Sequence, residues 1–216
     1  MAQLPFITFE GSEGCGKSTQ VKLLADRLRA AGVPFVLTRE PGGTPIGEKV
    51  RDLLQFAPES AVMSPETEVL LFEASRAQLL REIIKPALER GECVIADRFF
   101  DSTSVYQGVA RKLDYKFVQQ LNSFAVGDCI PDITLVLDVD LQTAHARMKG
   151  PRRPDRMEQQ SDDFYERVIK GYRDLAKSES KRVVLIDGSQ SAEAISGEIW
   201  KILTARFPQL ASKSKR

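Results

Sequence analysis

The sequence predicts an α/β fold in which helices flank a parallel sheet of five strands. Short apolar runs typical of strands alternate with segments whose apolar side chains recur at helical spacing. One of these runs, residues 92–97, shows no polar alternation, as expected for a strand that is buried on both faces. A glycine-rich turn joins the first strand to the first helix, and the order strand, loop, helix, strand is the signature of a βαβ unit.

The elements are expected in order along a chain of 216 residues. The first strand begins at Phe6 and stops before Gly11, and apolar side chains from Val21 onward then recur at helical spacing until Gly32. The further strands are expected at residues 33–38, 92–97, 133–139 and 182–186, and the further helices at 46–55, 66–90, 115–126 and 191–207.

One basic segment interrupts this alternation. Residues 147–156 carry five basic side chains and one acidic one, and their two prolines and one glycine prevent a continuous helix. Helical periodicity resumes after Ser161, which is a suitable N-cap. An exposed basic loop between two helices is a candidate lid, and we place it at about residues 147–158 within a single domain of residues 1–216.

Composition limits the class of protein. Thirty-one Lys and Arg balance 30 Asp and Glu, which argues against bulk binding of nucleic acid or of a membrane surface. Three cysteines without a CxxC pair and a single histidine argue against a zinc site and fit reduced thiols. The N-terminus lacks the features of a signal peptide, and no apolar run is long enough to span a membrane. These observations predict a cytoplasmic protein.

The segment Gly11–Ser18 matches the pattern G-x-x-x-x-G-K-[ST] between a strand and a helix. Glycines allow backbone N–H groups to converge on phosphate oxygens, and the helix that follows adds its positive dipole end. Lys17 is expected to reach the β- and γ-phosphates, and the Ser18 hydroxyl is expected to ligate Mg²⁺. The residues expected to bind ATP are Gly11, Ser12, Glu13, Gly14, Cys15, Gly16, Lys17, Ser18 and Thr19.

The loop predicts a nucleoside triphosphate but not its fate. A GTPase is disfavoured, because its N-K-x-D motif is absent: the only asparagine is Asn122, and Ser123 follows it. A kinase for a small acceptor is favoured. A kinase acting on dCMP, UMP or a deoxynucleoside and, less favoured, a non-enzymatic nucleotide-binding switch remain alternatives.

Further segments give a resemblance to a family. TREPGG at residues 38–43, the segment 71–78, DRFFDSTSVYQG at 97–108 and the later 155–158 resemble bacterial thymidylate kinases of the P-loop nucleoside monophosphate kinase family. The resemblance extends from residue 6 to about residue 202. It implies transfer of the γ-phosphoryl of ATP to dTMP, giving dTDP and ADP in dTTP biosynthesis, with Mg²⁺. It also implies a homodimer.

The same resemblance implies roles for the acceptor site. Phe72 would stack on thymine while Arg76 hydrogen-bonds the base, and Tyr106 would crowd the 2′ position of the sugar. Arg51 and Arg98 would hold the acceptor phosphate. The full implied dTMP-binding set is Glu40, Pro41, Arg51, Phe72, Arg76, Asp97, Arg98, Thr103, Tyr106 and Gln107.

Catalysis is expected to depend on charge neutralisation. Glu13 would position the acceptor, and the loop has Gly14 where eukaryotic-type enzymes carry an arginine, so the loop lacks a cation at that point. We therefore expect lid arginines to contact the transferred γ-phosphoryl. The expected catalytic residues are Glu13, Lys17, Arg98, Arg152 and Arg153.

Overall fold

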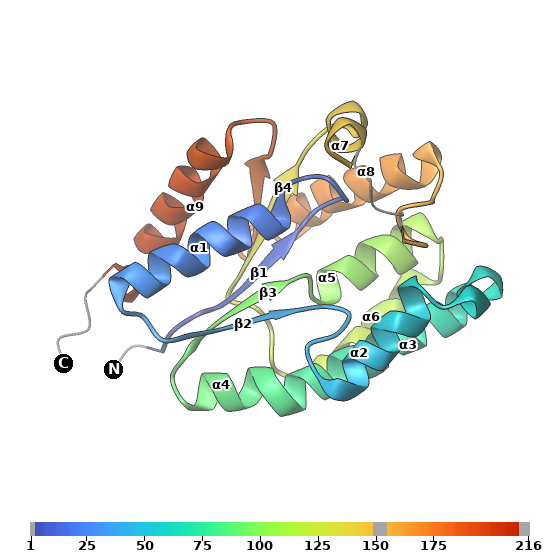
Figure 1. Cartoon of the computed structure of the whole chain (residues 1–216), viewed down its shortest axis with the longest axis horizontal. Coiled ribbons are helices and arrows are strands. Elements are labelled where there is room, and N and C mark those ends of the chain that lie inside the picture. Colours follow the sequence, from blue (N-terminus) through green and yellow to red (C-terminus); the bar gives the residue numbers. More distant parts are fainter. Residues whose placement is uncertain (1–2, 149–154, 212–216) are drawn as a thin grey trace.

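The five predicted strands are present and form one parallel sheet in the order β2-β3-β1-β4-β5. The computed structural model describes residues 3–148 and 155–211. The strands are β1 (Phe6–Glu10), β2 (Phe35–Arg39), β3 (Cys93–Asp97), β4 (Ile133–Asp138) and β5 (Val183–Asp187). Each lies within one or two residues of its predicted range, so the α/β fold class is confirmed (Figure 1).

Helices connect the strands, and most of them were predicted. Ser161 caps its helix as expected, because its side chain accepts a hydrogen bond from the Phe164 N–H at 3.3 Å. The helices are α1 (Lys17–Ala31), α2 (Pro45–Gln55), α3 (Pro65–Leu79), α4 (Lys85–Glu89), α5 (Phe100–Thr103), α6 (Tyr115–Val126), α7 (Leu141–Met148), α8 (Asp162–Ser178) and α9 (Ala192–Arg206).

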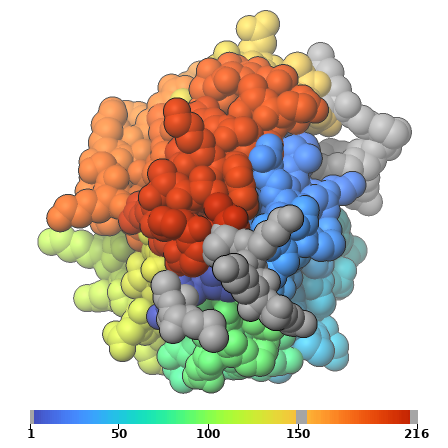
Figure 2. All heavy atoms as spheres, turned by 90° about the vertical axis from the view of Figure 1, so that its left-hand side faces the viewer, coloured from blue at the N-terminus to red at the C-terminus, as the bar shows by residue number. Residues whose placement is uncertain are grey.

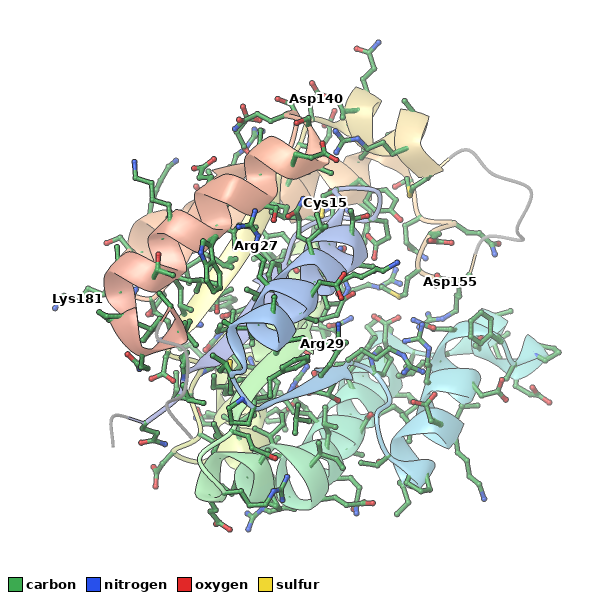
Figure 3. The ribbon with its side chains drawn as sticks, turned by 60° about the vertical axis from the view of Figure 1, so that its left-hand side comes forward. Cys15, Arg27, Arg29, Asp140, Asp155 and Lys181 are labelled. Carbon is green, nitrogen blue, oxygen red and sulfur yellow. The ribbon has the colours of Figure 1, made fainter. Side chains whose placement is uncertain are left out.

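One face of the sheet is covered by α1 and α9, which lie side by side although they come from opposite ends of the chain (Figures 1 and 2). Leu24 and Leu28 of α1 and Ile199 of α9 belong to one buried cluster with the sheet residues below them. Arg27 ties the two helices together, since its guanidinium lies 5.8 Å from the centre of the Trp200 ring (Figure 3).

The other face is covered by α3 to α6 and by α8. Two buried clusters lie there: one joins α4 and the end of α3 to β3, and the other joins α8 to β4 and β5. The single helix predicted over 66–90 is α3 and α4 joined by a π-helical segment at Leu80–Ile84. Among the described residues, no helix has the length and apolar character needed to cross a membrane.

The strand order creates a crevice at the carboxyl ends of the strands. β2 and β3 lie on one side of β1, and β4 and β5 lie on its other side, so the chain connections run in opposite directions from β1. Ligands bind at such switch points, beyond the carboxyl ends of the strands. Glu10, Arg39 and Asp97 end three adjacent strands there. Arg98 follows with a φ of 72°, an uncommon left-handed conformation for a residue with a side chain.

The predicted lid falls partly outside the described residues. Arg147 lies in the last turn of α7 and donates to the Gly188 carbonyl at 2.8 Å, and residues 155–158 form a turn before α8. Arg152 and Arg153 lie outside the described residues, as does the tail from Ser212.

Candidate active site

A cavity of about 390 Å³ opens at the carboxyl edge of the sheet. Nearly all residues of the predicted acceptor site line it, together with part of the phosphate-binding loop. Its predicted lining residues are Glu13, Gly14, Lys17, Ser18, Glu40, Pro41, Arg51, Phe72, Asp97, Arg98, Thr103, Tyr106 and Gln107. Those not predicted are Arg39, Gln55, Ser102, Asp155, Met157 and Glu158.

The loop between β1 and α1 has the backbone that phosphate binding requires. Gly11, Gly14 and Gly16 have positive φ values of 133°, 72° and 101°, which residues with side chains rarely adopt. A Cβ at Gly11 would lie 2.6 Å from the Leu137 carbonyl oxygen, so the loop can pass close to β4 only with glycine there. Gly16 is the N-cap of α1, whose first N–H groups therefore point toward the cavity side of the loop.

The Lys17 ammonium is folded back over this loop. It donates to the Ser12 carbonyl at 2.8 Å and to the Gly11 carbonyl at 3.2 Å, and it lies 3.5 Å from the Cys15 sulfur. Cys15 is buried at the N-terminal end of α1 (Figure 3) and does not line the cavity. Thr19 is exposed and also lies outside the lining. Lys17 thus braces the loop while remaining at the cavity wall.

Ser18 and Asp97 bring two oxygen groups together at the start of α1. The Ser18 hydroxyl donates to the Asp97 carboxylate at 2.9 Å. Mg²⁺ prefers oxygen ligands and usually keeps several waters, completing its shell with substrate phosphates. The pair fits such an ion. No cluster of three His, Cys, Asp or Glu side chains suited to a metal occurs in residues 3–148 and 155–211, so the protein offers only part of a shell. Asp97, predicted to contact dTMP, lies beside the expected metal ligand.

Glu13, Arg98 and Tyr106 form a hydrogen-bonded group between the loop and the acceptor wall. Arg98 donates to one Glu13 oxygen at 2.7 Å, and the Tyr106 hydroxyl donates to the other at 2.5 Å. Burial alone would raise the pKa of Glu13, but the charges of Arg98 and Lys17 outweigh it and hold that pKa below its ordinary value. The Arg98 guanidinium also lies over the Tyr106 ring, 5.0 Å from its centre.

Glu10 lies beneath Arg98, with 3.9 Å between its carboxylate and the guanidinium, and it was not predicted from the sequence as a site residue. Its fully buried carboxylate accepts from the Phe99 N–H at 2.8 Å, the Ser102 hydroxyl at 2.6 Å and the Tyr172 hydroxyl at 2.7 Å. These bonds hold the turn that begins at Arg98. An acidic residue ending an apolar strand next to the glycine-rich loop is the signal that could have identified it.

Arg76 is the one residue of the predicted acceptor set that does not line the cavity. Its side chain is 1% exposed and forms ion pairs with Glu40 at 2.6 Å and Glu73 at 2.5 Å, and it donates to Thr103 at 3.0 Å. Most of its donors are therefore engaged within the protein. Contact between Arg76 and a base stays a prediction, and it would have to use an N–H that these partners leave available.

The outer wall of the cavity combines one aromatic ring with cations. Phe72 on α3 is half-buried, and Arg51 on α2 donates to the Pro41 carbonyl at 3.0 Å. Asp155 lies between the half of the molecule that holds α7 and α8 and the half that holds α2 and α3 (Figure 3). Arg156 crosses the same gap, because its guanidinium donates to the Leu54 carbonyl at 2.9 Å.

The loop, the strand order and a cavity that holds an aromatic ring and several arginines beside the phosphate site define a P-loop kinase fold with room for a second, smaller substrate. Comparison with known families gives the particular one. The chain belongs to the thymidylate kinase family, whose model matches residues 9–199.

Individual relatives agree along almost the whole chain. The thymidylate kinase of Geobacter sulfurreducens is 47% identical over 210 residues, which cover 94% of this chain and 98% of the relative. That of Symbiobacterium thermophilum is 46% identical over 204 residues, covering 94% of each. The crystal structure of thymidylate kinase from Ehrlichia chaffeensis has a TM-score of 0.77 at 38% identity and covers 94% of this chain and 99% of that one.

Proposed function

We propose that this protein transfers the γ-phosphoryl group of ATP to dTMP, giving dTDP and ADP on the route to dTTP. Membership of the thymidylate kinase family supports the reaction. The observation that carries the proposal to the site is that the phosphate-binding lysine and the half-buried ring of Phe72 line one cavity. A donor and an acceptor can therefore bind side by side in the same cavity.

The donor triphosphate binds at the loop between β1 and α1. Lys17 exchanges its bonds with the loop carbonyls for bonds with the β- and γ-phosphates. Ser18 and Asp97 would hold Mg²⁺, which would neutralise charge on the phosphate oxygens. Backbone N–H groups of the loop supply the remaining contacts.

The acceptor is a phosphate monoester whose second pKa is about 6, so at neutral pH it is mostly a dianion and needs no strong base. The main barrier is repulsion between two anions, about 4 kcal/mol for unit charges 4 Å apart at an effective dielectric of 20. Arg98 and Arg51 reduce it by binding the acceptor phosphate. Glu13 remains ionised and orients Arg98, whose Nη2 lies 2.7 Å from its carboxylate.

The lid completes the charge balance when it closes. Arg152 and Arg153 are the candidates for contact with the transferred phosphoryl, because the loop carries Gly14 at the point where a loop arginine would act. Closure also excludes water, which would otherwise accept the phosphoryl.

Steady-state turnover tests the reaction. ADP release is measured with dTMP, dUMP, UMP, dCMP and dGMP at saturating ATP and Mg²⁺. We expect dTMP to give the highest kcat/KM. A higher value with dCMP or UMP would instead support another nucleotide kinase, and tight ATP binding without turnover of any monophosphate would support a switch.

We also propose a homodimer in the cytoplasm. Helices α3 and α6 pack together, and each exposes apolar side chains: Leu70 at 54% on α3, and Phe117 at 55% and Phe124 at 88% exposure on α6. A second copy of the same face would cover them. Cys15, Cys93 and Cys129 are free thiols, which fit a reducing compartment.

A further inference from the structure

Glu68 is a buried carboxylate one layer behind the cavity. It lies on α3, its side chain is 1% exposed, and it is absent from the cavity lining. One of its oxygens accepts from the Gln107 amide nitrogen at 2.8 Å and from Arg111 Nε at 3.2 Å. The other accepts from Arg111 Nη2 at 3.1 Å and from Arg156 Nη2 at 2.5 Å.

This carboxylate can only accept hydrogen bonds. Burial alone would raise the pKa of Glu68, but the hydrogen bonds and charge of Arg111 outweigh that effect, so its pKa lies below the ordinary value. An ionised carboxylate offers no donor. The side-chain amide of Gln107 must therefore turn its NH₂ group toward Glu68, whichever way the two amide atoms would otherwise be assigned.

The orientation fixes what Gln107 offers to a ligand. Gln107 lines the cavity, and its NH₂ group is directed at Glu68, so its carbonyl oxygen is the group left for a bound base. A carbonyl oxygen accepts from the ring N3–H of thymine or uracil. Cytosine carries an unprotonated N3, so the same oxygen would meet an acceptor.

We propose that Glu68 is a positioning residue for base selection: it holds the Gln107 amide so that the cavity presents an acceptor to a pyrimidine N3–H. The inference rests on the proposed acceptor site. Glu68 does not touch the substrate and acts only through Gln107. Arg111 and Arg156 hold Glu68 in place by occupying the rest of its lone pairs.

The substitution Glu68→Gln tests this proposal by reversing the direction of the hydrogen bond between residue 68 and the Gln107 amide. Two guanidinium donors, Nη2 of Arg111 and Nη2 of Arg156, face the outer oxygen position, whereas only one, Nε of Arg111, faces the inner position. The new carbonyl therefore occupies the outer position, and the new NH₂ faces Gln107. Gln107 then rotates and turns its own NH₂ toward the base. The ratio of kcat/KM for dTMP to that for dCMP should fall by at least about 10-fold, as expected when one buried hydrogen bond is replaced by a mismatch.

Two controls separate positioning from general damage. The ratio of dTMP to dUMP should stay within about twofold, because both bases carry N3–H and the loss should be shared. Asp101→Asn removes another buried carboxylate. Asp101 pairs with Arg182 at a distance of 2.6 Å, and neither residue lines the cavity. This variant should leave the dTMP to dCMP ratio unchanged even if it lowers the melting temperature.

A second variant covers the case in which Glu68→Gln does not fold. Glu68→Leu combined with Arg111→Leu replaces the buried ion pair with apolar groups, a change that is often tolerated. It frees the Gln107 amide to rotate, so the dTMP to dCMP ratio should fall again. An unchanged ratio in a folded, active variant of either kind would overturn the proposal. Failure of the wild type to prefer dTMP would instead contradict the proposed function.

Discussion

Lys17 is the only cationic side chain of the phosphate-binding loop. We expect Lys17→Ala to lower kcat by at least about 10³-fold, because transfer depends on neutralising charge at the γ-phosphoryl. The fold should survive, since the lysine contacts only loop carbonyls and one sulfur. The measurements are steady-state turnover with dTMP and thermal unfolding by circular dichroism. A folded variant within about tenfold of wild-type turnover would refute the role.

Glu40 gives the protein a predicted dependence of stability on pH. Burial, together with the nearby Glu73 carboxylate, raises the pKa of Glu40 from 4.5 to about 7, against the attraction of Arg76. The folded state therefore holds a proton that the unfolded state releases. The stabilisation from Glu40 is complete below about pH 4.5 and is lost as the pH rises to and beyond about 7.

The substitution Glu40→Gln keeps the shape but removes the titration. Unfolding free energies from urea titrations between pH 5 and 8 should decline with pH on the order of 1–3 kcal/mol more in the wild type than in the variant. Parallel curves for the two proteins would show that Glu40 does not titrate in this range.

At single positions, the sequence could predict which residues belong to a site but not which side chains they contact. The loop pattern predicted that Lys17 and Ser18 belong to the phosphate site, because that prediction needs only chain-local geometry, and both residues line the cavity. The burial of Arg76 between Glu40 and Glu73 depends on how α3 meets the chain after β2, and no spacing in the sequence encodes that contact. The same holds for Glu10, whose carboxylate accepts hydrogen bonds from Phe99, Ser102 and Tyr172.

Among the elements, the sequence predicted those with a strong period. Helix α6 and the start of α8 agree with the structure to the residue, because an apolar stripe or an N-cap marks them. The helical segment at 100–110 was missed. Its second part, Ser104–Ala110, is π-helical, so its side chains do not follow the 3.6-residue period, and Gly108 lowers the helical propensity. That segment places Tyr106 and Gln107 in the cavity wall.

The lid is the element with the strongest expected effect on the chemical step. Arg152→Ala combined with Arg153→Ala should lower kcat by at least about 100-fold, since arginines that reach a transferred phosphoryl contribute about 10³–10⁵. ATP affinity, measured by equilibrium binding, should change much less, because the loop backbone and Lys17 hold the ground state. Each single variant should lose less than the pair.

A near-normal kcat in the double variant would transfer the role to another basic residue of the lid. The candidates are then Arg147, Lys149 and Arg156. In the structure Arg147 donates to the Gly188 carbonyl and Arg156 pairs with Glu68. Alanine variants of the three, measured one at a time, identify which of them takes the role.

On the scale of the whole molecule, the sheet order explains why donor and acceptor meet. The phosphate loop follows β1, and β3 ends at Asp97, which Arg98 follows. The two strands are hydrogen-bonded neighbours although about 80 residues separate them in the chain. Alternating strand and helix signals predicted the parallel sheet. They do not define its strand order, so the position of α2 and α3 opposite the loop became known only from the structure.

The face of α3 and α6 that points away from the cavity carries the last prediction. Phe117 and Phe124 lie about two helical turns apart on α6, and Leu70 lies on the adjoining α3. All three side chains are exposed. If a second copy covers this face, Phe124→Glu buries a charge in the interface and should weaken self-association by at least about 100-fold. Sedimentation equilibrium measures it, with Leu185→Glu on β5 as the matched control at another exposed apolar position.

Dimer loss should also affect the acceptor site, because the same helix serves both faces. α3 carries Leu70 outward while Phe72 faces the cavity and Glu68 holds Gln107. Without its partner, α3 loses apolar contacts on one side, and its position becomes less restricted. The monomeric variant should therefore show a higher KM for dTMP and a nearly unchanged KM for ATP, whose loop lies on β1 and α1. A monomeric wild type, or equal changes in both KM values, would contradict this coupling.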